Sequence, residues 1–124
     1  MQLIKIIVFL FGLGSEDGLP QKEVSQKKLL DLTSTTWTLS YNSPGFGPRR
    51  YDLVFHPGGK LQNFHPNEST PDNDHWSQDG KEVTLRINDD YVIYKGIIKN
   101  DKFMSGTAKN KVGKSWEWKA QRKE

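Results

Sequence analysis

Two short segments at opposite ends of the chain alternate strictly between polar and apolar residues, and they constrain the fold more than any other feature. One is Ser115–Ala120, with the sequence SWEWKA, and the other is Thr36–Tyr41, with the sequence TWTLSY. Alternation with a period of two is typical of a half-buried antiparallel β-strand. Because both segments carry a tryptophan face, we predict that the first and last strands pair and close a barrel, with Trp116 or Trp118 near Trp37.

Six further segments of strand character lie between these two, separated by turn sequences such as Pro57-Gly58-Gly59 and Gln78-Asp79-Gly80. Short strands at regular intervals are typical of an all-β barrel or sandwich. We therefore expect a single eight-stranded antiparallel up-and-down barrel, with a long loop over residues 42–48. The predicted strands are Thr36–Tyr41, Arg50–His56, Lys60–Phe64, His75–Ser77, Glu82–Ile87, Tyr91–Lys99, Lys102–Lys109 and Lys114–Arg122.

The phase of the alternation predicts which side chains face the interior. Small residues in 102–109 face large ones in 114–122, as the interior of a closed barrel requires. Leu61 and Phe64 are out of phase, which favours a β-bulge, and residues 91–99 offer two faces, Tyr94/Gly96/Ile98 or Tyr91/Ile93. The other predicted inner residues are Trp37, Leu39, Tyr41, Tyr51, Leu53, Phe55, Val83, Leu85, Ile87, Met104, Gly106, Ala108, Trp116, Trp118 and Ala120.

The first 32 residues are expected to lie outside the sheet. Residues 1–21 form an apolar leader and a linker, and residues 22–124 form the barrel domain, which begins with a short amphipathic helix over 22–32. The apolar run 3–11 is shorter than the roughly 20 residues of a membrane-spanning helix, so we expect no stable membrane insertion of the mature domain. It resembles a secretory signal, which implies a secreted or periplasmic protein. The alternative is a cytoplasmic protein in which this run packs on the barrel.

Composition excludes several kinds of chemistry. The 124 residues include no cysteine, so disulfides, thiolate metal sites and cysteine nucleophiles are ruled out. No serine lies in a nucleophile motif, and acidic pairs such as Asp89-Asp90 are typical of turns. His56, His65 and His75 lie near Asp72 and Asp74 in the sequence, but the predicted hairpin separates His56 from His65 by more than about 15 Å. We expect no enzyme activity, no metal and no cofactor.

Aromatic residues on the inner faces are the best indication of function. Such rings more commonly fill the core of a barrel, but tyrosine hydroxyls and indole N–H groups need partners inside, which is also consistent with a partly open cavity. We therefore expect a non-enzymatic barrel that binds a small apolar or aromatic molecule. The expected ligand-binding residues are Trp37, Tyr41, Tyr51, Phe55, Tyr94, Trp116 and Trp118.

The charge distribution supports an alternative function. The net charge is +3, and residues 95–124 carry nine Lys or Arg against three acids. Such a basic outer face could bind a protein or a polyanion, although lysines also commonly line a solvated sheet face. Nucleic acid is not expected, because the aromatic rings that would stack on bases point inward. The lysines concerned are Lys95, Lys99, Lys102, Lys109, Lys111, Lys114 and Lys119.

Several motifs resemble those of a known group of barrels. They are Trp37, Phe55–Lys60, Asp74–Gly80, Tyr94–Gly96, Met104–Ala108 and the final Trp116, Trp118 and Arg122. Over residues 30–122 the chain resembles the lipocalin-like and avidin-like small barrels of the calycin group, and more closely the short uncharacterised lipocalin-like domains of bacteria. In the lipocalin signature a G-x-W sequence opens the first strand, and here Thr35 stands at the glycine position. The resemblance implies that Arg122 stacks on Trp37 and closes the barrel end.

Overall fold

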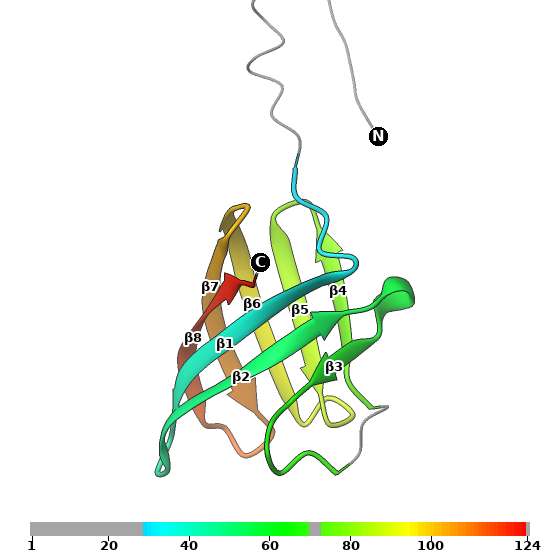
Figure 1. Ribbon diagram of the computed structural model, residues 1–124. Coiled ribbons are helices and arrows are strands. Elements are labelled where there is room, and N and C mark those ends of the chain that lie inside the picture. The colour runs from blue at the N-terminus through cyan, green and yellow to red at the C-terminus, as the bar shows by residue number, and fades with distance from the viewer. Residues whose placement is uncertain (1–28, 70–72, 124) are drawn as a thin grey trace, which may run out of the picture.

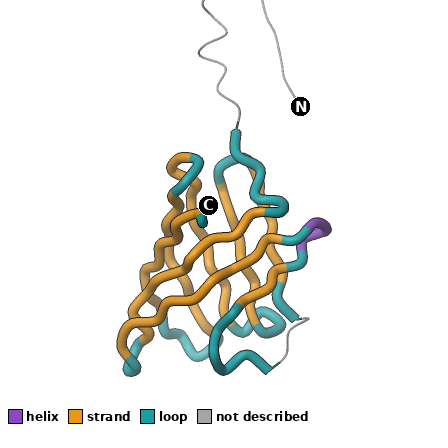
Figure 2. The backbone as a smooth tube through the Cα atoms, in the orientation of Figure 1, coloured by secondary structure: helices purple, strands orange, loops and turns teal. Residues whose placement is uncertain are grey.

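The structure is a computed structural model that describes residues 29–69 and 73–123. It is an eight-stranded antiparallel sheet curled into a nearly closed barrel, with one short helical turn, η3 (Pro57–Gly59) (Figures 1 and 2). The strand order is β3-β2-β1-β8-β7-β6-β5-β4. The strands are β1 (Thr35–Ser43), β2 (Gly47–Phe55), β3 (Leu61–Asn63), β4 (His75–Asp79), β5 (Glu82–Ile87), β6 (Val92–Asn100), β7 (Phe103–Asn110) and β8 (Ser115–Arg122).

The predicted pairing of the first and last strands is confirmed. β1 and β8 are antiparallel neighbours, with Tyr41 opposite Trp118 and Trp37 opposite Arg122. This register puts Arg122, and neither Trp116 nor Trp118, opposite Trp37. Trp118 pairs four residues further along β1, at Tyr41. On the other side, the barrel is closed by an isolated bridge between Lys60 and His75, next to β3 and β4.

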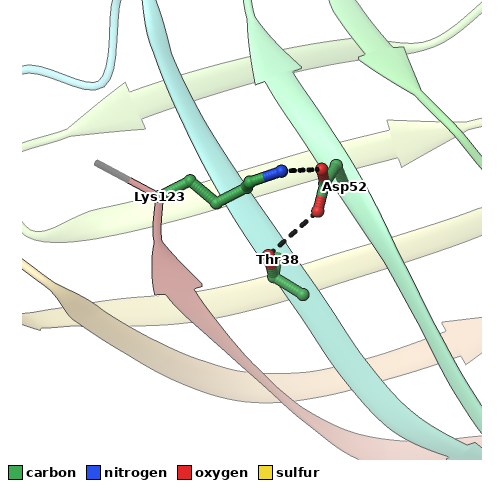
Figure 3. Close-up of polar contacts among 3 residues, drawn as sticks. All are labelled: Thr38, Asp52 and Lys123. Carbon is green, nitrogen blue, oxygen red and sulfur yellow. Dashed lines mark hydrogen bonds and ion pairs between the residues drawn. The ribbon is translucent and has the colours of Figure 1, made fainter.

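The C-terminal residues reinforce the junction between β1 and β2 from outside (Figure 3). Lys123 Nζ lies 2.7 Å from Asp52 Oδ2, and Thr38 Oγ1 donates a hydrogen bond to Asp52 Oδ1 at 2.9 Å. The backbone N–H of Lys123 also donates to the carbonyl of Thr36 at 2.8 Å. The hydrogen bond from Lys123 is the largest cause that lowers the pKa of Asp52 from its ordinary value.

Strand β8 fits against β7 because the two strands complement each other in size. Gly106 lies opposite Trp118, and Ala108 lies opposite Trp116. Gly106 also lies opposite Gly96 of β6, and a Cβ built on Gly96 would lie 2.4 Å from Cζ2 of Trp118. The indole therefore occupies space that two glycines leave open, and the inner face of β6 is Tyr94, Gly96 and Ile98.

Two predicted details of the chain path are wrong. β1 runs on to Ser43 and β2 starts at Gly47, so residues 44–46 form a tight hairpin turn in place of the long loop. Proline is tolerated in this part of β2 because β3 pairs only with Leu53–Phe55, which leaves Pro48 on a free edge. The predicted bulge in β3 is also absent: Asn63 takes the inner position, and Phe64 is 52% exposed.

One end of the barrel is closed by the segment that precedes β1 (Figure 1). Leu32 is fully buried in the core, and its N–H donates to Gln78 Oε1 at 3.0 Å while Gln78 Nε2 donates to the carbonyl of Leu30 at 2.6 Å. Because a β4 side chain satisfies these backbone groups, residues 29–32 form no helix. The rest of the predicted helix, residues 22–28, lies outside the described residues, as does the leader.

Trp37 is held in the same closed end. Its indole N–H donates to Thr35 Oγ1 at 2.9 Å, and the Thr35 hydroxyl donates to the carbonyl of Leu32 at 2.5 Å. Threonine at the glycine position of the lipocalin signature thus satisfies both a buried indole N–H and a buried carbonyl.

Candidate functional site

Four strands bring polar aromatic side chains together at the end of the barrel opposite Trp37. Tyr41 comes from β1, Tyr51 from β2, Tyr94 from β6 and Trp116 from β8, each at an inward position of its strand. The Tyr41 ring is central: it stacks on Trp116 with centroids 5.8 Å apart and meets the edges of Tyr51 and Tyr94 at 6.2 and 6.1 Å. These four residues are called the aromatic floor below.

The tyrosine hydroxyls of the aromatic floor lie close to one another. Tyr41 Oη and Tyr51 Oη are 3.4 Å apart. Burial raises the pKa of both Tyr51 and Tyr94 above the ordinary value of 10.0, and Tyr41 adds to the effect at both groups. Both phenols are therefore neutral at physiological pH, and each can donate as well as accept a hydrogen bond.

The indole nitrogen of Trp116 is enclosed without a hydrogen-bond partner. The indole N–H of Trp116 lowers the pKa of Tyr94, although burial raises this pKa by more. No hydrogen bond of normal geometry joins the indole N–H to the Tyr94 hydroxyl. Buried indole N–H groups are nearly always paired. A donor thus remains unsatisfied within the aromatic floor.

Polar groups surround the aromatic floor and fix the segments next to it. Those that line the pocket around the floor are called the polar border below: Asn63, His65, Asn67, Glu68 and Asn88. Asn63 Nδ2 donates to the buried Asp74 carboxylate and, at 2.9 Å, to Glu68 Oε1. The N–H of Asn88 donates to Asp74 Oδ1 at 2.8 Å. Burial is the largest cause that raises the pKa of Asp74 from its ordinary value. This carboxyl group thereby connects β3 to the start of β4 and to the β5–β6 turn.

His65 joins this polar border to the aromatic floor. Its ring meets the edge of Tyr51 with centroids 5.0 Å apart, and its Nδ1 accepts a hydrogen bond from the N–H of Asn67 at 2.9 Å. The N–H of His65 in turn donates to Asn63 Oδ1 at 3.1 Å. The segment after β3 is thus tied to the barrel by side chains as well as by its backbone.

These groups line an open pocket of about 430 Å³ at the barrel mouth, called the mouth pocket below. Small-molecule sites commonly fall between about 300 and 1,000 Å³, so the volume is sufficient for one small ligand. Within the described part of the chain, no Lys or Arg lines this pocket. The lining residues are Tyr41, Tyr51, Tyr94 and Trp116 of the floor, with Ser43, Asn63, His65, Asn67, Glu68, Ser69, Asn73, Ile87, Asn88, Tyr91, Val92 and Asn110.

The sequence-predicted site residues divide into two groups. Tyr41, Tyr51, Tyr94 and Trp116 line the mouth pocket, whereas Trp37, Phe55 and Trp118 are buried in the core and do not line it. The predicted partner of Trp37, Arg122, lies opposite it in the β1–β8 ladder.

Sequence reasoning missed the polar border, above all Asn63, His65 and Asn88. The alternation that places Leu61 inside also places Asn63 inside. This alternation was the feature of the sequence that could have predicted Asn63 as an inner residue. The partners that make a buried asparagine acceptable, Glu68 and Asp74, come from other segments.

The basic residues of the last strands are exposed on the outer surface. Arg86, Lys95, Lys109 and Lys111 line a shallow groove of about 670 Å³ across β5, β6 and β7. Arg86 forms an exposed ion pair with Asp90 at 3.1 Å. Lys119 lines a different hollow, near β1 and β8.

Residues 29–69 and 73–123 contain no group of three His, Asp or Glu side chains that could hold a metal ion. His56 Nε2 lies 2.8 Å from Gln62 Oε1 and His65 borders the mouth pocket, while Asp72 lies outside the described residues. Within the same residues no helix is long and apolar enough to cross a bilayer. Comparison with known protein families, with curated proteins and with solved structures gave no match.

Proposed function

We propose that the protein is a non-enzymatic, lipocalin-like barrel that binds one small molecule in the mouth pocket, with an apolar or aromatic face of the ligand against the aromatic floor. The supporting observation is that Tyr41, Tyr51, Tyr94 and Trp116 converge from four strands on an open pocket, while the opposite end is closed by packed side chains. A barrel of eight strands has room for one such ligand.

Intrinsic fluorescence can test the proposal because the four tryptophans lie in different environments. Trp116 borders the mouth pocket, whereas Trp76 contacts Phe55 and donates to the carbonyl of His56 at 2.9 Å. We expect small aromatic and lipophilic compounds to change the emission of the wild type and of Trp76→Phe. The change should be lost in Trp116→Phe. If no compound changes the emission, or if Trp116→Phe responds like the wild type, the proposal is wrong.

Export forms part of the same proposal. The apolar run 3–11 followed by Gly12, Gly14 and Ser15 has the pattern of a secretory signal, which supports a secreted or periplasmic barrel in a bacterium. N-terminal sequencing of the protein from an expressing bacterium tests this: a mature chain that starts near residue 15 is expected. A chain that keeps Met1 in the cytoplasm would contradict export.

The outer groove supports a second candidate, binding of a polyanion or an acidic protein. Lys95, Lys109 and Lys111 flank one hollow of about 670 Å³, and such binding must weaken as salt screens the charges. We expect retention on heparin at low salt that falls in Lys109→Glu. Lys81→Glu, in the β4–β5 turn and outside this groove, makes the same change of charge and is the matched control. Equal retention of both variants, or no retention at low salt, removes this candidate.

A further inference from the structure

The polar border of the mouth pocket specifies the ligand further. Resting on the proposed function, we propose that the ligand is a neutral polyhydroxylated ring, a monosaccharide or a disaccharide. Its C–H face would pack on the aromatic floor, and its hydroxyl groups would bond to the surrounding amides.

The aromatic floor suits such a sugar ring because its residues have flat apolar faces, and three of the four also carry a hydroxyl group. A pyranose presents C–H groups on one face, which pack against the electron-rich face of an aromatic ring. Tyr41 and Tyr51 are half-buried, and their hydroxyl oxygens lie 3.4 Å apart. Each hydroxyl can exchange hydrogen bonds with sugar hydroxyls in either direction.

The border supplies donors and acceptors at several positions around the floor. The side-chain amides of Asn67 and Asn88 are exposed and line the pocket. Each offers two donors and one acceptor oxygen. Because His65 Nδ1 already accepts a hydrogen bond from Asn67, Nε2 is the N–H donor of this ring. A wholly apolar ligand would cover these groups without pairing them, which is unfavourable.

Charge argues against an acidic ligand. Among residues 29–69 and 73–123, none that lines the mouth pocket is a Lys or Arg, and Glu68 lines it with a carboxylate that Asn63 holds in place. An anionic group would therefore meet a like charge and no counter-charge. Hydroxyl groups pair with amides, phenols and a carboxylate alike, so a neutral sugar fits all of them.

Two substitutions can remove border amides without disturbing the backbone. Asn88 adopts a left-handed conformation with φ of 54°, and its N–H donates to Asp74, so Asn88→Gly keeps both features. Asn67→Ala keeps the N–H that donates to His65. The matched control is Asn42→Ala: Asn42 is exposed on β1, next to Tyr41 in sequence but outside the mouth pocket.

The experiment is an NMR titration of the ¹⁵N-labelled full chain with methyl glucoside, methyl galactoside, methyl mannoside, N-acetylglucosamine and their disaccharides, and separately with indole and cyclohexanol. For ligands this small we expect dissociation constants on the order of 1 mM. Chemical shifts should move at the Trp116 indole N–H and around Tyr51. Affinity should fall roughly tenfold in Asn88→Gly and in Asn67→Ala, the loss of one hydrogen bond, and stay unchanged in Asn42→Ala.

The other outcomes separate this inference from the proposed function. Binding of indole or cyclohexanol in the mouth pocket without any sugar response overturns the sugar inference and leaves the proposed function standing. Sugar-induced shifts elsewhere on the barrel, or sugar binding that Asn88→Gly and Asn67→Ala do not weaken, also overturn it. No response to either set of compounds overturns both.

Discussion

Replacing Gly106 by alanine tests how closely β6 and β7 approach beneath the Trp118 indole. A Cβ on Gly106 would lie 1.9 Å from the carbonyl oxygen of Lys95 and 2.5 Å from Cα of Gly96. Both atoms belong to the backbone, so no side-chain rotation can relieve the overlap. The strands would have to separate by roughly 1.5 Å to restore ordinary contacts, which is large against their normal spacing of about 4.8 Å.

The expected cost follows from this geometry. Overpacking a core typically costs about 1–3 kcal/mol and occasionally more, and here the backbone ladder itself must shift. We therefore expect Gly106→Ala to lower the free energy of unfolding by about 3 kcal/mol or more, even after the gain of roughly 0.4–1 kcal/mol from a less flexible unfolded chain. For a barrel of this size the midpoint of thermal unfolding should fall by at least about 10 °C.

Gly113→Ala provides the control that separates a steric clash from backbone strain. Gly113 has φ of 87°, but a Cβ there would meet no atom within 4 Å. We expect this variant to lose only about 1–2 kcal/mol, the cost of placing an L-residue in the left-handed region. Circular dichroism and tryptophan emission during urea unfolding measure both variants. If Gly106→Ala is as stable as Gly113→Ala or more stable, the close approach of β6, β7 and Trp118 is wrong.

Four further predictions follow from the closed end, the last strand and two carboxyl groups. Thr35→Val keeps the side-chain volume but leaves the indole N–H of Trp37 unpaired; the Leu32 carbonyl loses the hydroxyl and keeps its bond from the Thr35 N–H. Urea unfolding should therefore show a free energy of unfolding that is lower by about 1–3 kcal/mol; an unchanged stability contradicts the bond from the indole. Deleting residues 115–124 removes β8 from the middle of the sheet and should abolish cooperative thermal unfolding, which a retained sharp transition would refute. Asp52→Asn should lower the free energy of unfolding at pH 7 and lower it much less near pH 3. A hydrogen bond from Lys123 lowers the pKa of Asp52, so the stability that the ionised Asp52 contributes is lost as pH falls. Asp74→Asn should show the opposite trend, gaining stability relative to the wild type as pH rises from 3 to 7, because burial raises the pKa of Asp74; parallel pH profiles would contradict both assignments.

Period-two alternation predicted the inner face of the long strands other than β6, because the side chains of a strand alternate between two sides whatever the tertiary context. For β6 it did not decide which face points inward, since both faces of this strand carry apolar residues. The choice of Tyr94, Gly96 and Ile98 depends on Gly96 meeting Gly106 and Trp118 across two ladders, and this register exists only in the folded sheet.

The same limit explains why only some of the predicted site residues line the mouth pocket. Alternation tells which face a residue occupies but not its height along the barrel axis, which depends on strand register and tilt. Trp37 and Tyr41 share the inner face of β1, yet one lies in the closed end and the other in the mouth pocket. Hydrophobicity misled the prediction for β3 because Phe64 is more apolar than Asn63. Asn63 is nevertheless buried because Asp74 and Glu68 accept its N–H groups.

The two ends of the barrel differ in a way that bears on function. At the closed end, Leu32 fills the interior and Thr35 satisfies the indole N–H of Trp37. At the mouth, Trp116 keeps an unsatisfied N–H, and the exposed Asn88 amide borders an open pocket. Since the closed end and the packing of Trp118 against Gly96 hold the fold together, the exposed amides of Asn67 and Asn88 can be exchanged at little cost in stability. If the proposed function holds, ligand specificity can therefore change by substitution at the mouth while the sheet beneath it stays the same.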